Sequence, residues 1–167
     1  PKIGLGSVQF GLNYGVSNRL GKTTSEVVVT ILKEAFKKGV RIIDTAPSYG
    51  DSEAALGKSA IREIGFHVIT KTPHFKEKVI SPRAAELLRS TFLRSLELLR
   101  LDSVYGLLVH GVDDLFKSGA DTLLSMLHDL RDEGLVDRIG ASTYTPSQID
   151  KLINYCSVDI IQVPINV

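Results

Sequence analysis

The alternation of two kinds of segment is the feature that most constrains the fold of this chain. Short, continuously apolar segments such as Val104–His110 alternate with longer segments in which apolar residues recur every three or four positions. Strands that are apolar throughout are typical of a sheet covered on both faces, and a helical crossover is the usual connection between parallel strands. The pattern therefore predicts an α/β fold, a parallel sheet covered by helices.

Six strands and five helices are expected along the chain. The strands are predicted at residues 2–8, 40–44, 66–71, 104–110, 136–141 and 158–163, and the helices begin near residues 23, 51, 81, 118 and 145. Thr23 with Glu26, and Thr145 with Gln148, have the spacing of capping boxes. The helix near residue 51 is expected to start at an Asp51 N-cap and to run to about Glu63.

The length of the chain leaves two architectures open. A closed eight-stranded barrel takes about 250 residues, and this chain has 167. The predicted elements therefore form either an open sheet or three-quarters of a barrel. No linker or low-complexity segment interrupts them, so a single domain over residues 1–167 is expected.

Composition excludes several classes of protein. A formal net charge of +1 gives no electrostatic basis for binding nucleic acid or an anionic membrane. Cys156 is the only cysteine, so no internal disulfide can form and a reducing compartment is expected. No apolar run approaches the roughly 18 residues of a membrane helix, and no signal-peptide pattern opens the chain. The sequence predicts a soluble, cytoplasmic protein without nucleic-acid or membrane partners.

Chemically capable residues stand where three predicted strands end. Asp44, Lys71 and His110 end the second, third and fourth strands, and Tyr49 follows five residues after Asp44. The carboxyl ends of neighbouring parallel strands lie along one edge, where sites are built. Each residue alone has an ordinary structural explanation, as a cap, a solvated strand end or a packed side chain. Their consecutive placement instead predicts one cleft, whose rim continues through Ser142 and Gln162.

Such a set of side chains suits proton donation to a carbonyl oxygen. A free tyrosine has a pKa of about 10, which makes it a poor acid at neutral pH. A nearby ammonium lowers that pKa, and a carboxylate keeps the ammonium charged and in place. A histidine can orient the substrate oxygen. The set contains neither a nucleophile–base pair nor a metal-ligand cluster, so an external donor would have to reduce the electrophile.

Several motifs of this chain occur together, in the same order, in one known family. They are residues 4–7 (GLGS), 44–53 (DTAPSYGDSE) with 56–57 (LG), 70–71 (TK), 107–110 (LLVH), 139–142 (IGAS) and 161–164 (IQVP). With these motifs the sequence resembles the aldo-keto reductase superfamily. The resemblance implies a (β/α)8 barrel of the TIM-barrel type, NADPH as cofactor at the carboxyl ends of the strands, and hydride transfer to an aldehyde or ketone.

The resemblance also implies roles for individual residues. Tyr49 would be the proton donor, tuned by Lys71 and Asp44, and His110 would orient the carbonyl. Cofactor contacts would come from Gly6, Ser7, Asp44, Ser142 and Gln162, and from Thr143, where many members have asparagine. Substrate contacts are expected from the two loops visible in this chain, through Phe10, Tyr14 and His74.

The sequence departs from the family at its end. It stops at Val167, before the last two barrel strands and the residues that would distinguish NADPH from NADH. We therefore expect a fragment, an incomplete copy, or a chain that self-associates through exposed sheet edges. The first loop resembles members from bacterial sugar and surface-polysaccharide pathways, which suggests a sugar-derived carbonyl substrate.

Two other functions remain open from the sequence. One is an aldolase in which Lys71 forms a Schiff base with substrate. The other is a non-catalytic module of the same fold that binds nicotinamide or a partner.

Overall fold

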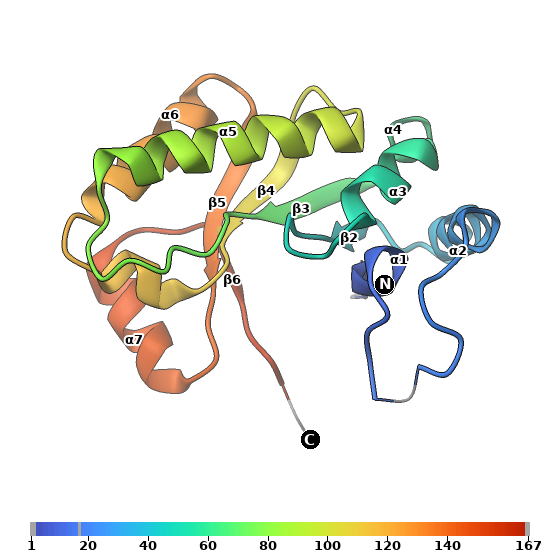
Figure 1. Cartoon of the computed structure of the whole chain (residues 1–167), viewed down its shortest axis with the longest axis horizontal. Helices are drawn as coiled ribbons and strands as arrows, with labels where there is room; N and C mark the ends of the chain where they lie inside the picture. The colour runs from blue at the N-terminus through green and yellow to red at the C-terminus, as the bar shows by residue number, and fades with distance from the viewer. Residues whose placement is uncertain (1–2, 17, 166–167) are drawn as a thin grey trace. The chain divides into compact units, whose positions relative to one another are not determined.

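The computed structural model of the chain describes residues 3–16 and 18–165 (Figure 1). The chain divides into two compact units, residues 1–70 with 93–104, and residues 71–92 with 105–167. Each unit contains parallel strands that alternate with helices. This confirms the predicted α/β class, while the single domain over residues 1–167 stays a prediction. Among the described residues, no helix is both long and apolar enough to cross a membrane.

The first unit is built around three parallel strands. Its elements are β1 (Gly4–Gly6), α1 (Val8–Gly11), α2 (Ser25–Lys37), β2 (Ile42–Asp44), α3 (Ser52–Lys58), α4 (Ile61–Ile64), β3 (His67–Lys71, up to Thr70) and the end of α5 (Pro82–Leu99). The strands follow chain order in the sheet, with Gly6 beside Asp44 and Asp44 beside Ile69. The core of this unit consists of Val28, Leu32, Ile43, Leu56, Ile61, Val68 and Leu99.

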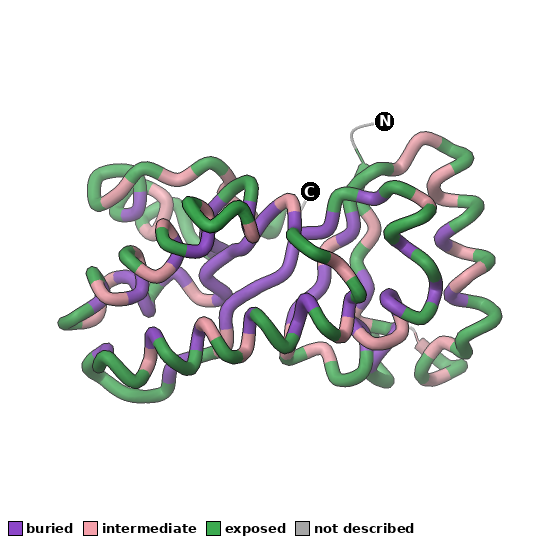
Figure 2. Tube along the Cα trace, turned by 90° about the horizontal axis from the view of Figure 1, so that it is seen from above, coloured by how far each residue is buried: buried purple, intermediate pink, exposed green. Residues whose placement is uncertain are grey.

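The second unit repeats the alternation. It contains the first part of α5, β4 (Val104–Val109), the 3-10 turn η1 (Val112–Phe116), α6 (Asp121–Asp132), β5 (Val136–Ser142), α7 (Pro146–Tyr155) and β6 (Ile160–Gln162). β5 and β6 pair in parallel, with Ser142 beside Gln162. The core of this unit consists of Leu88, Leu107, Leu108, Leu115, Leu123, Leu127, Leu130 and Leu152. Figure 2 shows how buried and exposed positions alternate along the helices, as expected for helices that cover a core with one face.

The start of the chain differs from its prediction. The strand expected at residues 2–8 is shorter, and Lys2 lies outside the described residues. Val8, predicted as the last residue of that strand, begins α1 instead, because the chain turns there and the Phe10 N–H donates to the Ser7 carbonyl. The capping box expected at Thr23 is wrong: α2 begins at Ser25 after an N-cap Thr24 that makes no side-chain cap bond.

The helix expected from Asp51 to Glu63 is two helices. α3 ends at Lys58, and Ala60 takes a left-handed conformation with φ of 57° before α4. Asp51 is the N-cap residue of α3, yet its side chain makes no cap bond and pairs with Lys22 instead. An amphipathic pattern does not reveal such a break, because the residues on both sides keep helical spacing.

The predicted capping box at Thr145 is confirmed, and it extends further than expected. The Gln148 N–H donates to Thr145 Oγ1, and Gln148 Oε1 accepts from the N–H groups of Tyr144 and Thr145. The amide nitrogen of Gln148 donates to Asp113 in η1 at 3.0 Å. One side chain thus links the loop after β5, the start of α7 and η1. The fourth predicted helix starts later than expected, at Asp121, because the preceding residues form η1 and the turn at Gly119.

Candidate functional site

In the first unit, buried hydroxyl groups connect the ends of β1 and β2. Ser7 Oγ donates to the backbone oxygen of Asp44 at 2.8 Å, and the Ser7 N–H donates to the same oxygen. Ser52 Oγ lies 2.9 Å from the Ser7 carbonyl oxygen, 2.8 Å from Ser7 Oγ and 3.2 Å from Thr45 Oγ1. Ser7, Thr45 and Ser52 are fully buried. The backbone that carries the half-buried Asp44 is therefore fixed on both sides of this residue.

Tyr49 lies in the tight connection between β2 and α3. Its N–H donates to the Ala46 carbonyl, and its own carbonyl accepts from the Ser52 N–H at 3.2 Å. Gly50 takes a φ of 58°, which favours glycine. Gly11 of α1 packs so closely that a Cβ there would lie 1.8 Å from the Tyr49 carbonyl oxygen. Helix α1, which the sequence did not predict, thus contacts the backbone of the predicted proton donor.

Glu53 has contacts that were not predicted from the sequence. Glu53 is an acidic residue in the first turn of α3, yet its side chain is only 2% exposed. Thr70 Oγ1 donates to Glu53 Oε1 at 2.6 Å, and Thr70 is itself fully buried. Thr70 directly precedes Lys71, the last residue of β3. The sequence offers one signal for these buried contacts. The polar residues Ser52 and Glu53 stand side by side after the predicted N-cap, shortly before the apolar Leu56.

In the second unit, Lys71 and His110 are buried, and backbone bonds involving Thr72 connect the neighbouring segments. The Thr72 N–H donates to the Leu108 carbonyl at 2.8 Å, and the His110 N–H donates to Thr72 Oγ1 at 3.2 Å. The exposed ring of His74 stacks on the His110 ring, with centroids 4.0 Å apart and an interplanar angle of 34°. The structure thus brings together two of the predicted residues, one for catalysis and one for substrate binding.

Three residues predicted to contact the cofactor also lie together in this unit. Ser142 Oγ donates to Gln162 Oε1 at 3.1 Å, and the Thr143 N–H donates to the Gln162 carbonyl at 2.8 Å. Thr143 is fully buried, and its Oγ1 has no hydrogen-bond partner among the described residues. Buried hydroxyl groups normally have a partner, so a ligand that hydrogen-bonds at this point would satisfy the group.

The other predicted residues lie in the first unit. Phe10 of α1 is 4% exposed, and the exposed Tyr14 accepts bonds at its carbonyl from Gln9 and Asn18. Gly6 ends β1, and a Cβ added there would have no atom within 4 Å. Asp44 and Tyr49 belong to the first unit, while Lys71 and His110 belong to the second. The combined arrangement of these four catalytic candidates stays a prediction.

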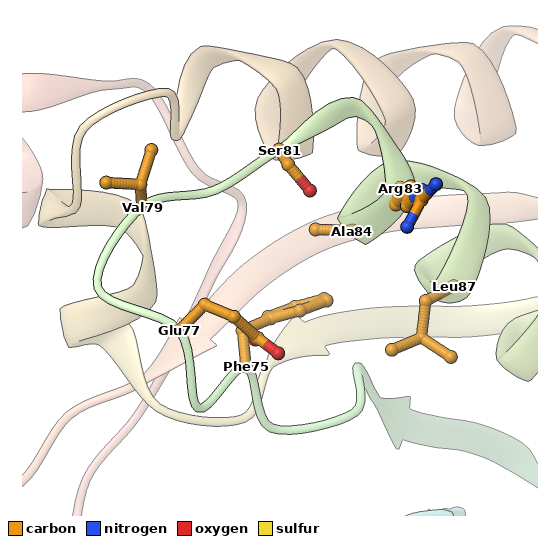
Figure 3. A pocket seen from close by; sticks show the side chains of 7 residues that line it. All are labelled: Phe75, Glu77, Val79, Ser81, Arg83, Ala84 and Leu87. Carbon is orange, nitrogen blue, oxygen red and sulfur yellow. The ribbon is translucent and has the colours of Figure 1, made fainter.

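A cavity in the second unit was not predicted from the sequence. It has a volume of about 290 Å³ and lies at the start of α5 (Figure 3). Its lining combines apolar side chains with one acidic and one basic side chain: Phe75, Glu77, Val79, Ser81, Arg83, Ala84 and Leu87. None of these residues is a predicted site residue, although Phe75 directly follows His74 in the chain.

Comparison with known proteins gives consistent matches. Residues 2–167 match the sequence profile of the Aldo/keto reductase family. L-galactose dehydrogenase of Arabidopsis thaliana is 30% identical over 156 residues, which cover 81% of this chain and 48% of that protein. NADH-specific methylglyoxal reductase of Escherichia coli (strain K12) is 27% identical over 182 residues, covering 96% of this chain and 54% of that protein. This chain therefore spans about half the length of these two relatives.

A solved structure shows the same arrangement of elements. A protein from Pseudomona aeruginosa, described as an aldo-keto reductase, is 29% identical with a TM-score of 0.75 over 96% of this chain and 61% of its own. The six strands and their helices thus match part of a (β/α)8 fold.

Proposed function

The chain belongs to the aldo/keto reductase family, and from that premise we propose that it takes part in NADPH-dependent reduction of an aldehyde or ketone, with Tyr49 as proton donor. One observation supports this proposal most. In each unit, predicted residues lie at the carboxyl end of a strand or in the connection that follows it, and hydrogen bonds hold several of them there. Such strand ends are where α/β folds of this kind build their sites.

The residues after β5 and in β6 fit a nicotinamide cofactor. A carboxamide offers both donors and an acceptor, and the buried hydroxyl of Thr143 lacks a partner among the described residues. Ser142 and Gln162 add a hydroxyl and an amide beside it. We assign these three residues to holding the carboxamide. The bound cofactor supplies the hydride.

The remaining residues handle the proton and the carbonyl. Tyr49 donates the proton to the carbonyl oxygen as negative charge develops there. The buried ammonium of Lys71 stabilises the phenolate left behind, and Asp44 balances its charge. His110 donates a hydrogen bond to the carbonyl oxygen, and its ring is kept in place by the stacked ring of His74. His74 and Tyr14 are exposed and suit contacts with the variable part of the substrate.

The names of two relatives and the first loop of the chain bear on the substrate and the cofactor. One relative is named for L-galactose and another for methylglyoxal, so we propose a small carbonyl compound, sugar-derived in view of the first loop. NADPH is the cofactor proposed here, and the relative named as NADH-specific makes NADH the necessary comparison.

The test begins with titration of NADPH into the 167-residue chain, followed by nicotinamide fluorescence, with NADH as comparison. A panel of small carbonyl compounds is then assayed with wild type and Tyr49→Phe. We expect saturable NADPH binding in both proteins and a loss of turnover of about 10²- to 10⁴-fold in Tyr49→Phe, the usual size of a general-acid contribution.

Other outcomes select the alternatives. Equal turnover by wild type and Tyr49→Phe would overturn the assignment of the proton donor. Binding of NADPH without reduction of any compound would favour the non-catalytic nicotinamide-binding module. Borohydride trapping of a carbonyl compound on Lys71 would favour the Schiff-base aldolase.

A further inference from the structure

We propose that Ser52 and Glu53, two consecutive residues in the first turn of α3, are positioning residues that hold the carboxyl ends of three strands for catalysis. The inference rests on the proposed reductase function, because it concerns the placement of Asp44, Tyr49 and Lys71. Neither residue has a role of its own in proton or hydride transfer.

The contacts of this pair reach all three strands of the first unit. Ser52 Oγ contacts Ser7, directly after β1, and Thr45, directly after β2. Glu53 accepts a hydrogen bond at 2.6 Å from Thr70 in β3. Two adjacent side chains on one helical turn are therefore bonded to the ends of β1, β2 and β3.

Burial makes these contacts strong constraints. Ser52 and Thr70 are fully inaccessible, and Glu53 is 2% exposed. A buried carboxylate that loses one hydrogen-bond donor is destabilised, because water cannot take the place of that donor, so alternative positions of the strand ends are disfavoured. A helix that only had to pack on the sheet would need apolar residues at these two places, as it has at Leu56.

Two of the bonded groups, Thr45 and Thr70, lie next to proposed catalytic residues. Thr45 follows Asp44, and Thr70 precedes Lys71, so their side chains fix the backbone from which the carboxylate and the ammonium project. Ser52 also donates its N–H to the Tyr49 carbonyl. Because misplacement of a catalytic group by about 1 Å can cost about 100-fold in rate, these bonds bear directly on turnover.

The test compares Thr70→Val with Thr70→Ser. Valine keeps the volume and removes the donor to Glu53, whereas serine keeps the donor. Ser59→Ala is the matched control, because Ser59 is the C-cap residue of α3 and its hydroxyl donates locally, to the Ala55 carbonyl at 2.6 Å. Amide hydrogen exchange at residues 69–72 is measured first, followed by steady-state reduction kinetics.

We expect exchange at residues 69–72 to rise at least 10-fold in Thr70→Val and to stay within about threefold of wild type in Thr70→Ser and Ser59→Ala. In kinetics, kcat of Thr70→Val should fall about 10- to 100-fold with KM changed less than threefold, and Thr70→Ser should recover most of kcat. Glu53→Gln should lower kcat in the same direction.

Two results would overturn the positioning role. One is unchanged exchange at residues 69–72 in Thr70→Val. The other is an equal rise in exchange throughout the chain, with kcat and KM affected alike, which would mean general loss of stability. A wild-type chain that reduces no carbonyl compound would refute the proposed function, whereas the exchange data decide on the positioning of the strand ends without turnover.

Discussion

Replacing Gly11 by alanine should destabilise the chain, although alanine is the better helix former. A Cβ at this position would lie 1.8 Å from the Tyr49 carbonyl oxygen, 2.4 Å from the Ser52 nitrogen and 2.9 Å from the Asp51 nitrogen. All three are backbone atoms, so no side-chain rotation can relieve the contact. To reach the 3.0 Å below which real Cβ contacts are essentially absent, α1 and the Tyr49 connection must separate by about 1.2 Å, the difference between the two distances.

The expected magnitude follows from two opposing effects. Overpacking of this kind costs about 1–3 kcal/mol, occasionally more. Because the atoms that the new Cβ would meet are all backbone atoms, we expect a cost near the upper end of this range. The gain in helix propensity from glycine to alanine is at most about 1 kcal/mol. We therefore expect a net loss of about 2 kcal/mol in the free energy of unfolding. For a chain of this size, that corresponds to a fall in Tm of about 4–8 °C.

Urea unfolding of the purified chain measures this effect, with Gly111→Ala as the matched control. Gly111 has an ordinary φ of −126°, and a Cβ there would have no atom within 4 Å. The control should therefore stay within about 0.5 kcal/mol of wild type. If Gly11→Ala were as stable as Gly111→Ala, the close packing of α1 against the Tyr49 connection would be refuted.

Three further changes test other parts of the structure. His74→Ala should lower kcat about 3- to 10-fold, while His74→Phe retains a ring against His110 and most of kcat; equal losses in both variants would mean that stacking is not what matters. The hydrogen bonds from Arg89 hold the pKa of Glu133 below its usual 4.5, so this pair stabilises the fold above about pH 4.5, and that contribution is lost as the pH falls through the lowered value. Urea midpoints of Glu133→Gln should accordingly differ from wild type at pH 7, and the difference should shrink as the pH falls below about 4.5. A difference that does not shrink over that range would contradict this. Thr145→Ala should cost about 1 kcal/mol by removing the cap of α7, which urea unfolding detects, and an unchanged midpoint would contradict it.

The sequence predicted the elements whose signals are local. Short segments rich in apolar residues located the strands, and the proline and glutamine that follow Thr145 marked the start of α7. These signals depend on neighbouring residues alone. It also placed Ser142 and Gln162 together, since residues at the ends of adjacent parallel strands must be neighbours.

The missed features depend on contacts between distant residues. Helix α1 is only four residues long, too short for a periodic pattern, and it packs on a connection that begins more than thirty residues later. The break between α3 and α4 occurs at Ala60, and this position is neither glycine nor proline, the residues that usually indicate such a break. The contact of Glu53 was not predicted, because its partner Thr70 is 17 positions away. Charge at a helix start is usually solvated, and only the fold shows that this one is buried.

The bonds of Gln148 have a thermodynamic consequence for any ligand that meets Thr143. The side-chain oxygen of Gln148 accepts from the backbone of Tyr144 and Thr145, and its side-chain nitrogen donates to Asp113 in η1. Fixing a backbone residue costs about 1–2 kcal/mol of conformational entropy, and for this loop the cost is met when the chain folds. A ligand that binds beside Thr143 therefore orders few additional backbone residues. The entropic cost of binding is smaller, and a larger part of the contact energy contributes to affinity.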